Sequence, residues 1–183
     1  MIRLDHVYKG FNGNAVLEDI SLALPEKGFC AITGRSGRGK TTLLYLIAGL
    51  YKPDRGSIYR DSERISMVFQ EDRLLPWEAA LQNAAIASTR ETAAELLAEL
   101  GLGAELDKYP KELSGGMKRR VSIARALAAK ADVYIMDEPF RGLDPETRSA
   151  VFGVIRRRTE DALLIMVTHD PTDAECADMR IDL

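Results

Sequence analysis

A glycine-rich run between two apolar segments carries the residue types that bind phosphate. It follows the apolar run Phe29 to Thr33, precedes a helical pattern, and reads Gly34, Arg35, Ser36, Gly37, Arg38, Gly39, Lys40, Thr41, Thr42. Glycines let the backbone N–H groups of such a loop point inward, and the N-terminus of the following helix adds positive potential. The run therefore predicts a phosphate-binding loop where a strand ends and a helix begins.

The side chains at the end of this loop have distinct expected partners. Lys40 is placed to reach the β- and γ-phosphates of a nucleotide, Thr41 to ligate a magnesium ion, and Thr42 to contact the next phosphate inward. Arg35 and Arg38 add positive charge beside the phosphates, although each fits equally well as a solvated loop residue. The alternative is a glycine turn that opens a helix. Residue frequencies put the bare pattern in roughly one of two hundred chains of this size, which favours phosphate binding.

Two adjacent carboxylates follow another apolar segment. The run from Val133 to Met136 predicts a buried strand, and Asp137 and Glu138 stand at its end. We expect Asp137 to hold magnesium, and Glu138 to act as the general base that polarises an attacking water. A polar strand cap is the alternative, and the phosphate loop makes it the minor one.

A histidine follows a third apolar segment in the same way. His169 comes directly after Thr168, at the end of the run Leu163 to Val167. Doubly wound sheets bind ligands at the carboxyl ends of their strands, so His169 is a candidate for contact with the γ-phosphate. A lone histidine after a strand is more often a cap or a surface residue, and only the other groups at this edge favour the functional interpretation.

A serine and two glycines before a long helical pattern form a second candidate anion site. Ser114 is a predicted N-cap, and the small residues Gly115 and Gly116 follow it. The hydroxyl, the backbone N–H groups and the helix dipole can then approach an anion closely. The alternative is an ordinary N-cap, which leaves the second glycine unexplained.

The segment from Leu113 to Arg120, taken with the phosphate loop and the Asp137–Glu138 pair, closely resembles the signature of ABC ATPases, and the resemblance extends over nearly the whole chain. It implies that the chain binds and hydrolyses ATP with Mg²⁺. It also implies that Ser114, Gly115 and Gly116 of one copy grip the γ-phosphate of ATP held by another, in a homodimer that closes head-to-tail on two ATP molecules.

Further positions match the ABC pattern residue by residue. Phe11 resembles the aromatic residue that stacks on adenine, although simple edge packing fits it equally well. Gln70 resembles the glutamine that touches magnesium and water, and Asp144 has the spacing of the aspartate loop between subunits. The resemblance thus implies Glu138, His169, Gln70 and Lys40 as catalytic groups, and Thr41, Gln70 and Asp137 as metal ligands.

The run Leu74 to Trp77 resembles the region of importer ATPases that receives a helix of the membrane subunit, although an apolar run with tryptophan is more often core. With Phe69 and Gln70, it is similar to nitrate, sulfonate and taurine importer ATPases. The chain departs from the family pattern at Met117 and Arg119, where glutamines are common, and at Arg141-Gly142, in place of a small Ser-Ala pair. The last departure affects the expected details of subunit contact.

The elements that must position these groups form an α/β pattern. Strands are expected over Ile2 to Tyr8, Ser21 to Leu24 and Phe29 to Thr33, then a strand pair up to Phe69. Helical spacing follows the phosphate loop, the middle of the chain and Ser114. A helix separates the two apolar strands that end near Asp137 and Val167, which implies a parallel sheet with an antiparallel edge.

The whole chain, residues 1–183, is expected to form one P-loop ABC-type ATPase domain. Residues 1–70 and 115–183 are assigned to a RecA-like core with an antiparallel β subdomain. Residues 71–114, where alanine and leucine dominate, are assigned to an inserted α-helical subdomain.

Composition narrows the class of protein. The net charge of −3 gives no overall positive field for nucleic acid, and no apolar run is long enough to cross a bilayer. The resemblance implies a cytoplasmic ATPase, peripheral on the inner face of the membrane through permease subunits, with a substrate-binding protein as a further partner. The alternatives are a soluble ABC-type ATPase in repair or translation, and a nucleotide-sensing module that binds ATP without hydrolysis.

Overall fold

A parallel sheet forms the centre of the protein. The computed structural model describes residues 1–168 and 170–183, apart from the side chain of Pro171. The strand order is β5-β6-β7-β3-β8, and the strands are β3 (Gly28–Thr33), β5 (Ile65–Val68), β6 (Val133–Asp137), β7 (Leu163–Val167) and β8 (Met179–Asp182). Continuous apolar runs suit β3, β6 and β7 because the sheet is covered on both faces.

A separate antiparallel sheet lies on one side of this centre. Its order is β2-β1-β4, from β1 (Ile2–Phe11), β2 (Asn14–Leu24) and β4 (Arg55–Arg60). Asn12 and Gly13 connect β1 to β2 with φ values of 52° and 81°, as a two-residue hairpin turn requires. The hairpin makes both strands longer than the sequence predicts, because pairing extends right up to this turn.

The two strands predicted before Phe69 are present, but the prediction that they pair with each other was wrong. β4 pairs with β1 in the antiparallel sheet, whereas β5 pairs in parallel with β6. Apolar periodicity identifies a strand but carries no information about its partner. The chain therefore leaves one sheet and enters the other between Arg60 and Ile65.

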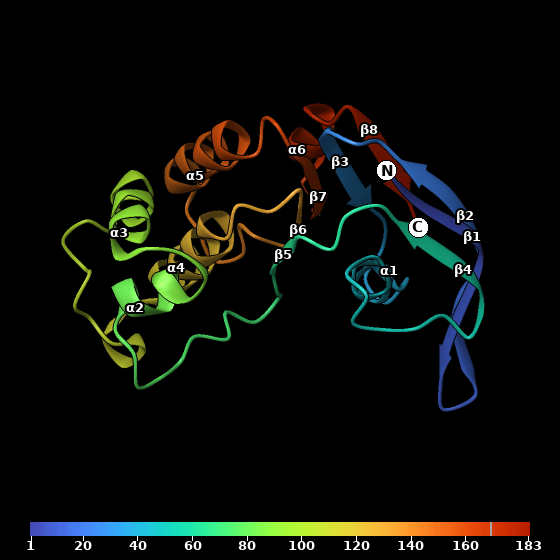
Figure 1. The fold of residues 1–183 in the computed structure, drawn as a ribbon, viewed down its shortest axis with the longest axis horizontal. Helices are drawn as coiled ribbons and strands as arrows, with labels where there is room; N and C mark the ends of the chain where they lie inside the picture. Colours follow the sequence, from blue (N-terminus) through green and yellow to red (C-terminus); the bar gives the residue numbers. More distant parts are fainter. Residues whose placement is uncertain (169) are drawn as a thin grey trace.

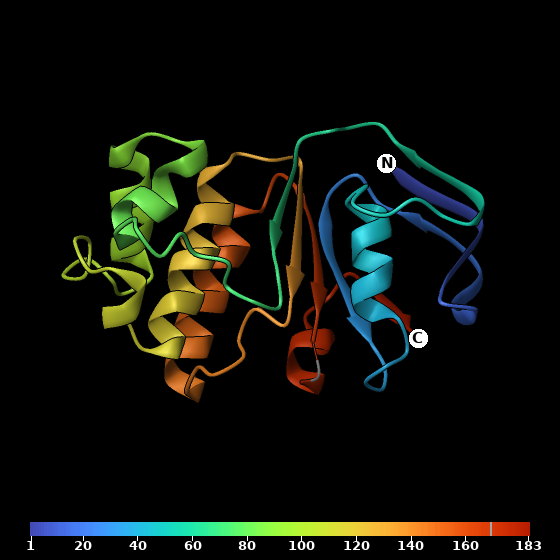
Figure 2. The same ribbon diagram turned by 90° about the horizontal axis from the view of Figure 1, so that it is seen from below.

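The helices lie on both faces of the parallel sheet (Figures 1 and 2). Helix α1 (Lys40–Ile47) lies between the parallel and antiparallel sheets. On the other face, α4 (Gly115–Ala128) and α5 (Pro145–Arg158) lie next to the sheet. Beyond them, α2 (Ala80–Ala84), η1 (Ala85–Ala87) and α3 (Arg90–Glu99) pack on α4. The shorter elements η2 (Pro110–Glu112) and α6 (Pro171–Glu175) precede α4 and β8.

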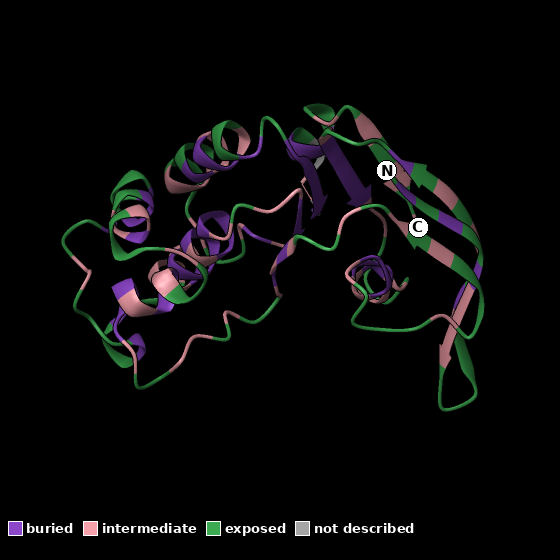
Figure 3. Ribbon diagram, in the orientation of Figure 1, coloured by how far each residue is buried: buried purple, intermediate pink, exposed green. Residues whose placement is uncertain are grey.

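Alternate residues of the central strands pack into two hydrophobic cores, one on each face of the sheet. Ile32, Ile135 and Ile165 pack in the core that includes α1 and the first hairpin. Ala31 and Met136 face the core under α2 to α5. Figure 3 shows the central strands as buried and the antiparallel sheet as largely exposed. Burial on both faces specifies the register of the strands, and the register determines where the strand ends lie along the sheet.

The expected helical subdomain, residues 71–114, contributes α2 and α3 to a cluster that packs on α4. Because α4 begins at Gly115, this cluster continues in space beyond the sequence range assigned to the subdomain. Among the described residues, no helix combines the length and apolar character needed to cross a membrane.

Candidate functional site

The glycine-rich loop connects β3 to α1, and its shape depends on glycine. Gly34 has φ 128°, and a Cβ atom there would lie 2.2 Å from the carbonyl oxygen of Leu183. Gly39 has φ 89°, and a Cβ atom there would lie 2.8 Å from Leu17 Cδ2. Both positive φ values disfavour other residues. The loop can therefore run close to neighbouring chain only because these positions carry no side chain.

Lys40 is held at the start of α1 by the loop itself. The residue is 6% exposed, and its Nζ donates to the carbonyl oxygens of Gly34 at 2.8 Å and Arg35 at 3.0 Å. These contacts place a buried positive charge inside the loop. A phosphate needs such a charge, together with backbone N–H groups, in order to bind here.

A hydrogen bond joins the loop to the carboxylate after β6. The Thr41 hydroxyl donates to Asp137 Oδ2 at 2.8 Å. Asp137 is 1% exposed, and burial, with a smaller contribution from the charge of Glu138, raises its pKa. The Thr41 hydrogen bond and the positive charges of Arg119 and Lys40 act in the opposite direction. Asp137 is thus a buried carboxylate that a nearby cation would stabilise.

One cavity, of about 300 Å³, brings the phosphate loop and the strand ends together. Val16 and Val167 provide apolar walls, and the polar lining consists of Ser36, Gly37, Gly39, Lys40, Thr41, Thr42, Gln70, Asp137 and Glu138. The polar lining therefore comes from three separate stretches of the sequence that share one space. Its ammonium group, hydroxyls and carboxylates can hold a polyphosphate and a water molecule side by side.

The oxygen atoms in this cavity suit magnesium. Among the described residues, no group of three or more His, Cys, Asp or Glu side chains forms a metal site. Magnesium does not need such a cage, because it keeps several waters and binds through one or two carboxylates plus the phosphates of a substrate. The Thr41 hydroxyl and the Asp137 carboxylate, 2.8 Å apart, fit that kind of site, with Gln70 in the same lining.

A second cavity, of about 600 Å³, collects the other candidate group. Ser114, Gly115, Gly116 and Asp144 all line it. Ser114 Oγ accepts a hydrogen bond from the Met117 N–H at 3.3 Å, so the N-cap interpretation describes its contact within the protomer. Asp144 Oδ1 likewise accepts from the Thr147 N–H at 2.9 Å, and this contact lowers its pKa. Both residues are exposed helix caps that face the same space.

Gln70 lines both cavities. It is exposed and follows β5 after one residue, Phe69. The loop that carries it is therefore the part of the protein that both cavities share.

Several predicted site residues lie outside the two cavities. Gly34, Arg35 and Arg38 line neither, and both arginines are exposed. Phe11 is 39% exposed at the end of β1, and it packs edge-on against Tyr51 with ring centroids 5.4 Å apart. Its ring is thus accessible and fixed by an aromatic neighbour that the sequence analysis did not identify.

The prediction for His169 lies outside the described residues. The chain beside it is tied to α5 and α6 by polar contacts. The Thr168 hydroxyl donates to Asp173 Oδ2 at 2.7 Å, and Arg148 forms ion pairs with Asp170 and Asp173. The end of β7 is therefore connected to the helix that Asp144 caps.

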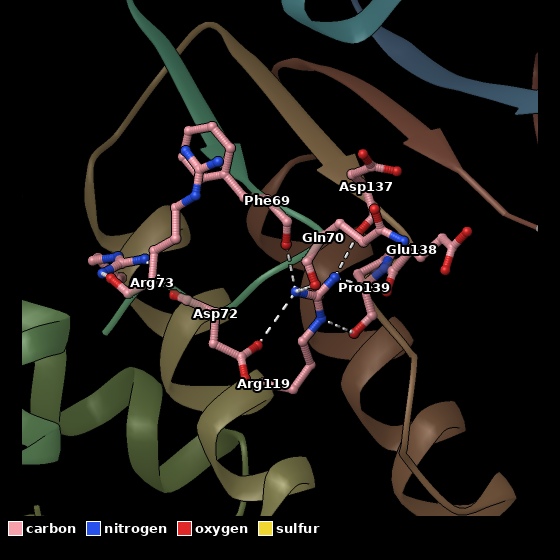
Figure 4. Close-up of polar contacts among 9 residues, drawn as sticks. Phe69, Gln70, Asp72, Arg73, Arg119, Asp137, Glu138 and Pro139 are labelled. Atoms are coloured by element: carbon pink, nitrogen blue, oxygen red, sulfur yellow. Dashed lines mark hydrogen bonds and ion pairs between the residues drawn. The ribbon is translucent and has the colours of Figure 1, made fainter. Parts of the chain in front are cut away.

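Sequence reasoning missed Arg119, which it treated only as a departure from a pattern. The residue is 2% exposed, and Figure 4 shows its guanidinium between the loop of Gln70 and the turn of Glu138. Its position on α4 gives the signal that could have identified it. Arg119 lies four residues before the buried Ile123, so the apolar face of the helix contains a charge that needs partners.

Comparison with known proteins identifies the family. Residues 17–141 match the family described as ABC transporter. An aliphatic sulfonates import ATP-binding protein (SsuB) of Agrobacterium fabrum is 41% identical over 180 residues, which cover 92% of this chain and 70% of the relative. A protein of the same name from Cupriavidus pinatubonensis is 40% identical, and the match covers 100% of this chain and 65% of the relative.

Solved structures agree with the sequence relatives. A dimeric post-hydrolysis state of the ATP-binding cassette MJ0796 bound to ADP and Pi has a TM-score of 0.92 and 30% identity, covering 100% of this chain and 94% of that chain. A dimeric structure of MJ0796, titled a bacterial ABC transporter cassette, has the same TM-score and 31% identity. The chain therefore belongs to the ABC transporter family, in which it is an ATP-binding and ATP-hydrolysing subunit.

Proposed function

We propose that two copies of this chain close head-to-tail on two ATP molecules and drive the import of a small solute through membrane-spanning permease subunits. The motor lies on the cytoplasmic face of the membrane, attached through the permease, and a substrate-binding protein delivers the solute. The observation that carries this proposal is the pair of cavities that share Gln70. One holds the phosphate loop and the carboxylates, and the other holds the caps Ser114 and Asp144.

The division of these groups between two cavities supports a dimer. A phosphate loop and its carboxylates provide groups on one side of a triphosphate. The Ser114 helix end and its glycines would provide donors on the other side, and they line a different cavity of the same protomer. A second copy, turned by a two-fold axis, supplies the missing half at each site. The solved structures with TM-scores of 0.92 are dimers, which supports the same arrangement.

The proposed reaction assigns one task to each group in the first cavity. Lys40 and Thr42 bind phosphate oxygens, while Thr41, Asp137 and Gln70 hold Mg²⁺. Bound there, Mg²⁺ neutralises charge that develops on the transferred phosphoryl group. Glu138 takes a proton from the attacking water.

The remaining assignments place other groups around the nucleotide. His169 contacts the γ-phosphate, and Phe11 stacks on adenine. The loop glycines and the arginines Arg35 and Arg38 contribute N–H groups and positive potential. Ser114, Gly115, Gly116 and Asp144 act on the nucleotide of the partner copy. These roles carry over from the ABC pattern. The shared lining of the second cavity by Ser114, Gly115, Gly116 and Asp144 supports the role of those four residues.

The loop after Gln70 is the proposed contact with the permease. Trp77 is 68% exposed, so the core interpretation of this tryptophan does not apply. A large exposed aromatic side chain near the loop suits a docking surface for a hydrophobic partner. The relatives are named as import proteins for aliphatic sulfonates, which favours a sulfonated organic anion as the transported solute.

The substitution Glu138→Gln tests the proposal. We expect steady-state ATP hydrolysis to fall about a hundredfold or more, as for loss of a general base, while ATP binding persists. With saturating ATP and Mg²⁺ the variant should run as a dimer in size-exclusion chromatography, whereas without nucleotide it should run as a monomer. Unchanged turnover would contradict the role of Glu138, and a monomer under all conditions would contradict the ATP-closed dimer.

A further inference from the structure

The guanidinium of Arg119 joins three stretches of the chain inside one protomer. Arg119 lies in the first turns of α4. Its N–H groups donate to the loop after β5, at the carbonyl oxygens of Phe69 and Gln70, and to the turn after β6, at the carbonyl oxygens of Asp137, Glu138 and Pro139. Figure 4 shows these contacts converging on the one side chain.

The contacts are directional and come from a buried side chain. Nη2 lies 2.7 Å from the Glu138 oxygen, Nε 3.1 Å from the Pro139 oxygen, and Nη1 3.4 Å from the Gln70 oxygen. The side chain is 3% exposed, and Nη1 also lies 3.3 Å from the Asp72 carboxylate. A guanidinium offers its N–H groups in a fixed plane. Moving one loop relative to the other would therefore break several hydrogen bonds of this guanidinium at once.

The turn that Arg119 holds is a strained one. Glu138 has φ 48°, the left-handed conformation that residues other than glycine rarely adopt. The carbonyl oxygens of Asp137 and Glu138, which precede and follow this φ angle, both accept from Nη2 of Arg119. These hydrogen bonds stabilise the backbone direction that puts the Glu138 side chain at the first cavity.

We propose that Arg119 is a positioning residue for ATP hydrolysis, which locks the loop of Gln70 to the turn of Glu138 so that both side chains are presented together to the nucleotide cavity. The inference rests on the proposed roles of these two residues. Arg119 lines the second cavity and not the first. It acts through backbone that it fixes, and it links the permease-facing loop to the site of hydrolysis.

Arg125 offers a matched control on the same helix. Its guanidinium donates to the carbonyl oxygens of Arg73 at 2.8 Å and Asp72 at 2.9 Å, so it also holds the loop after β5. In the structure it forms no hydrogen bond with Asp137, Glu138 or Pro139. The two arginines therefore separate anchoring of the loop alone from connection of the loop to the catalytic turn.

The test compares Arg119→Ala, Arg119→Lys and Arg125→Ala with the unmodified chain in single-turnover and steady-state ATP hydrolysis. Misplacement of catalytic groups by up to about 1 Å predicts that Arg119→Ala lowers kcat about thirtyfold, with KM within about twofold. Arg119→Lys keeps the charge and much of the volume but not the fixed plane of donors, so its kcat should also fall. Arg125→Ala should leave kcat nearly unchanged.

Binding and unfolding measurements exclude a trivial loss of structure. ATP affinity, from a fluorescent nucleotide titration, should stay within about twofold in both Arg119 variants, because Lys40 and the loop glycines are untouched. Thermal unfolding must still be a single transition, and Arg119→Lys serves as the reporter if the alanine variant does not fold. An unchanged kcat in folded Arg119 variants would overturn the proposal.

A double substitution distinguishes positioning from a general effect on stability. If Arg119 acts by placing Gln70 and Glu138, its replacement in a Gln70→Ala background should cost well under half of its thirtyfold effect on a logarithmic scale, because coupled sites are not additive. Fully multiplicative losses would contradict the proposal. Normal turnover in Glu138→Gln would instead refute the base assignment, whatever the Arg119 variants do.

Discussion

The phosphate loop and the Ser114 helix end are both glycine-containing N-termini of helices, but they differ in their contacts within the protomer. The phosphate loop is enclosed. Gly34 approaches Leu183, Lys40 is buried, and Thr41 is bonded to the carboxylate of another strand. The Ser114 end is open at Gly115, where a Cβ atom would meet nothing within 4 Å, whereas a Cβ atom on Gly116 would lie 3.1 Å from Leu143 Cδ2. One region is complete within the chain, whereas the other presents a surface.

This difference distinguishes two reasons why a position can require glycine. In the enclosed loop, glycine is required by backbone conformation and by neighbouring atoms of the same protomer. At Gly115, which is in helical conformation, neither the backbone nor a neighbouring atom of the protomer requires glycine. Under the proposed function, the demand at Gly115 comes from a nucleotide held by the partner copy.

The largest expected effect comes from Lys40→Met, which removes the charge of the enclosed loop but retains its volume. Hydrolysis should fall by at least about a hundredfold, because the β- and γ-phosphates lose a charged donor in a site shielded from water. ATP affinity, measured by isothermal titration, should fall as well, unlike in Glu138→Gln. Retention of both activities would show that the enclosed loop is not the phosphate site.

The next effect concerns Asp137, whose pKa burial raises. A carboxyl group whose folded pKa lies above its unfolded value favours the neutral form in the fold. Its contribution to stability is present below the unfolded pKa and is lost as pH rises through the folded pKa. Asp137→Asn removes this loss and still accepts from Thr41. Chemical denaturation should therefore find the metal-free variant more stable than the parent at neutral pH.

The same substitution should reduce hydrolysis about a hundredfold, because a carboxylate ligand of Mg²⁺ is lost. The stability gain of Asp137→Asn should shrink as the pH is lowered to about 4, near the ordinary aspartate pKa. A gain that is independent of pH would mean that the charge of Asp137 is not its cause.

A pair of glycine substitutions tests the comparison directly. Gly34→Ala places a Cβ atom 2.2 Å from the carbonyl oxygen of Leu183 at φ 128°, and should lower the free energy of unfolding by about 2 kcal/mol or more. Gly115→Ala should change it by less than about 0.5 kcal/mol, as at an exposed position. Yet Gly115→Ala should weaken ATP-dependent dimerisation of the Glu138→Gln chain in analytical ultracentrifugation. Normal dimerisation would leave Gly115 without the proposed role.

Ser114→Ala is expected to affect folding less than Gly34→Ala does. Loss of the cap to the Met117 N–H should cost about 1 kcal/mol in the free energy of unfolding. The control is Thr89→Ala, which removes the corresponding cap of α3, where Thr89 Oγ1 accepts from the Thr92 N–H at 3.2 Å. Both variants should lose similar stability, but only Ser114→Ala should impair dimerisation. If Ser114→Ala and Thr89→Ala behaved alike in both the unfolding and the dimerisation assays, Ser114 would act only as a structural cap.

Local pattern was sufficient for much of the fold. The continuous apolar runs that became β3, β6 and β7 were recognisable because burial on both faces leaves no polar positions. The helix starts at Lys40 and Gly115 were recognisable from glycines and a capping serine. Strand partnership was not, and β4 and β5 were therefore assigned wrongly to one pair.

The sequence by itself determined the chemistry of this protein. The order and spacing of its glycines, Lys40, the two carboxylates and Ser114 predict phosphate binding and indicate membership of the ABC family, since such backbone and side-chain chemistry is encoded within short segments. Only the tertiary structure decided which segments meet. It brought Gln70 to both cavities and turned Arg119 into a buried connection between two loops, because contacts between residues distant in sequence depend on packing of the whole sheet and its helices.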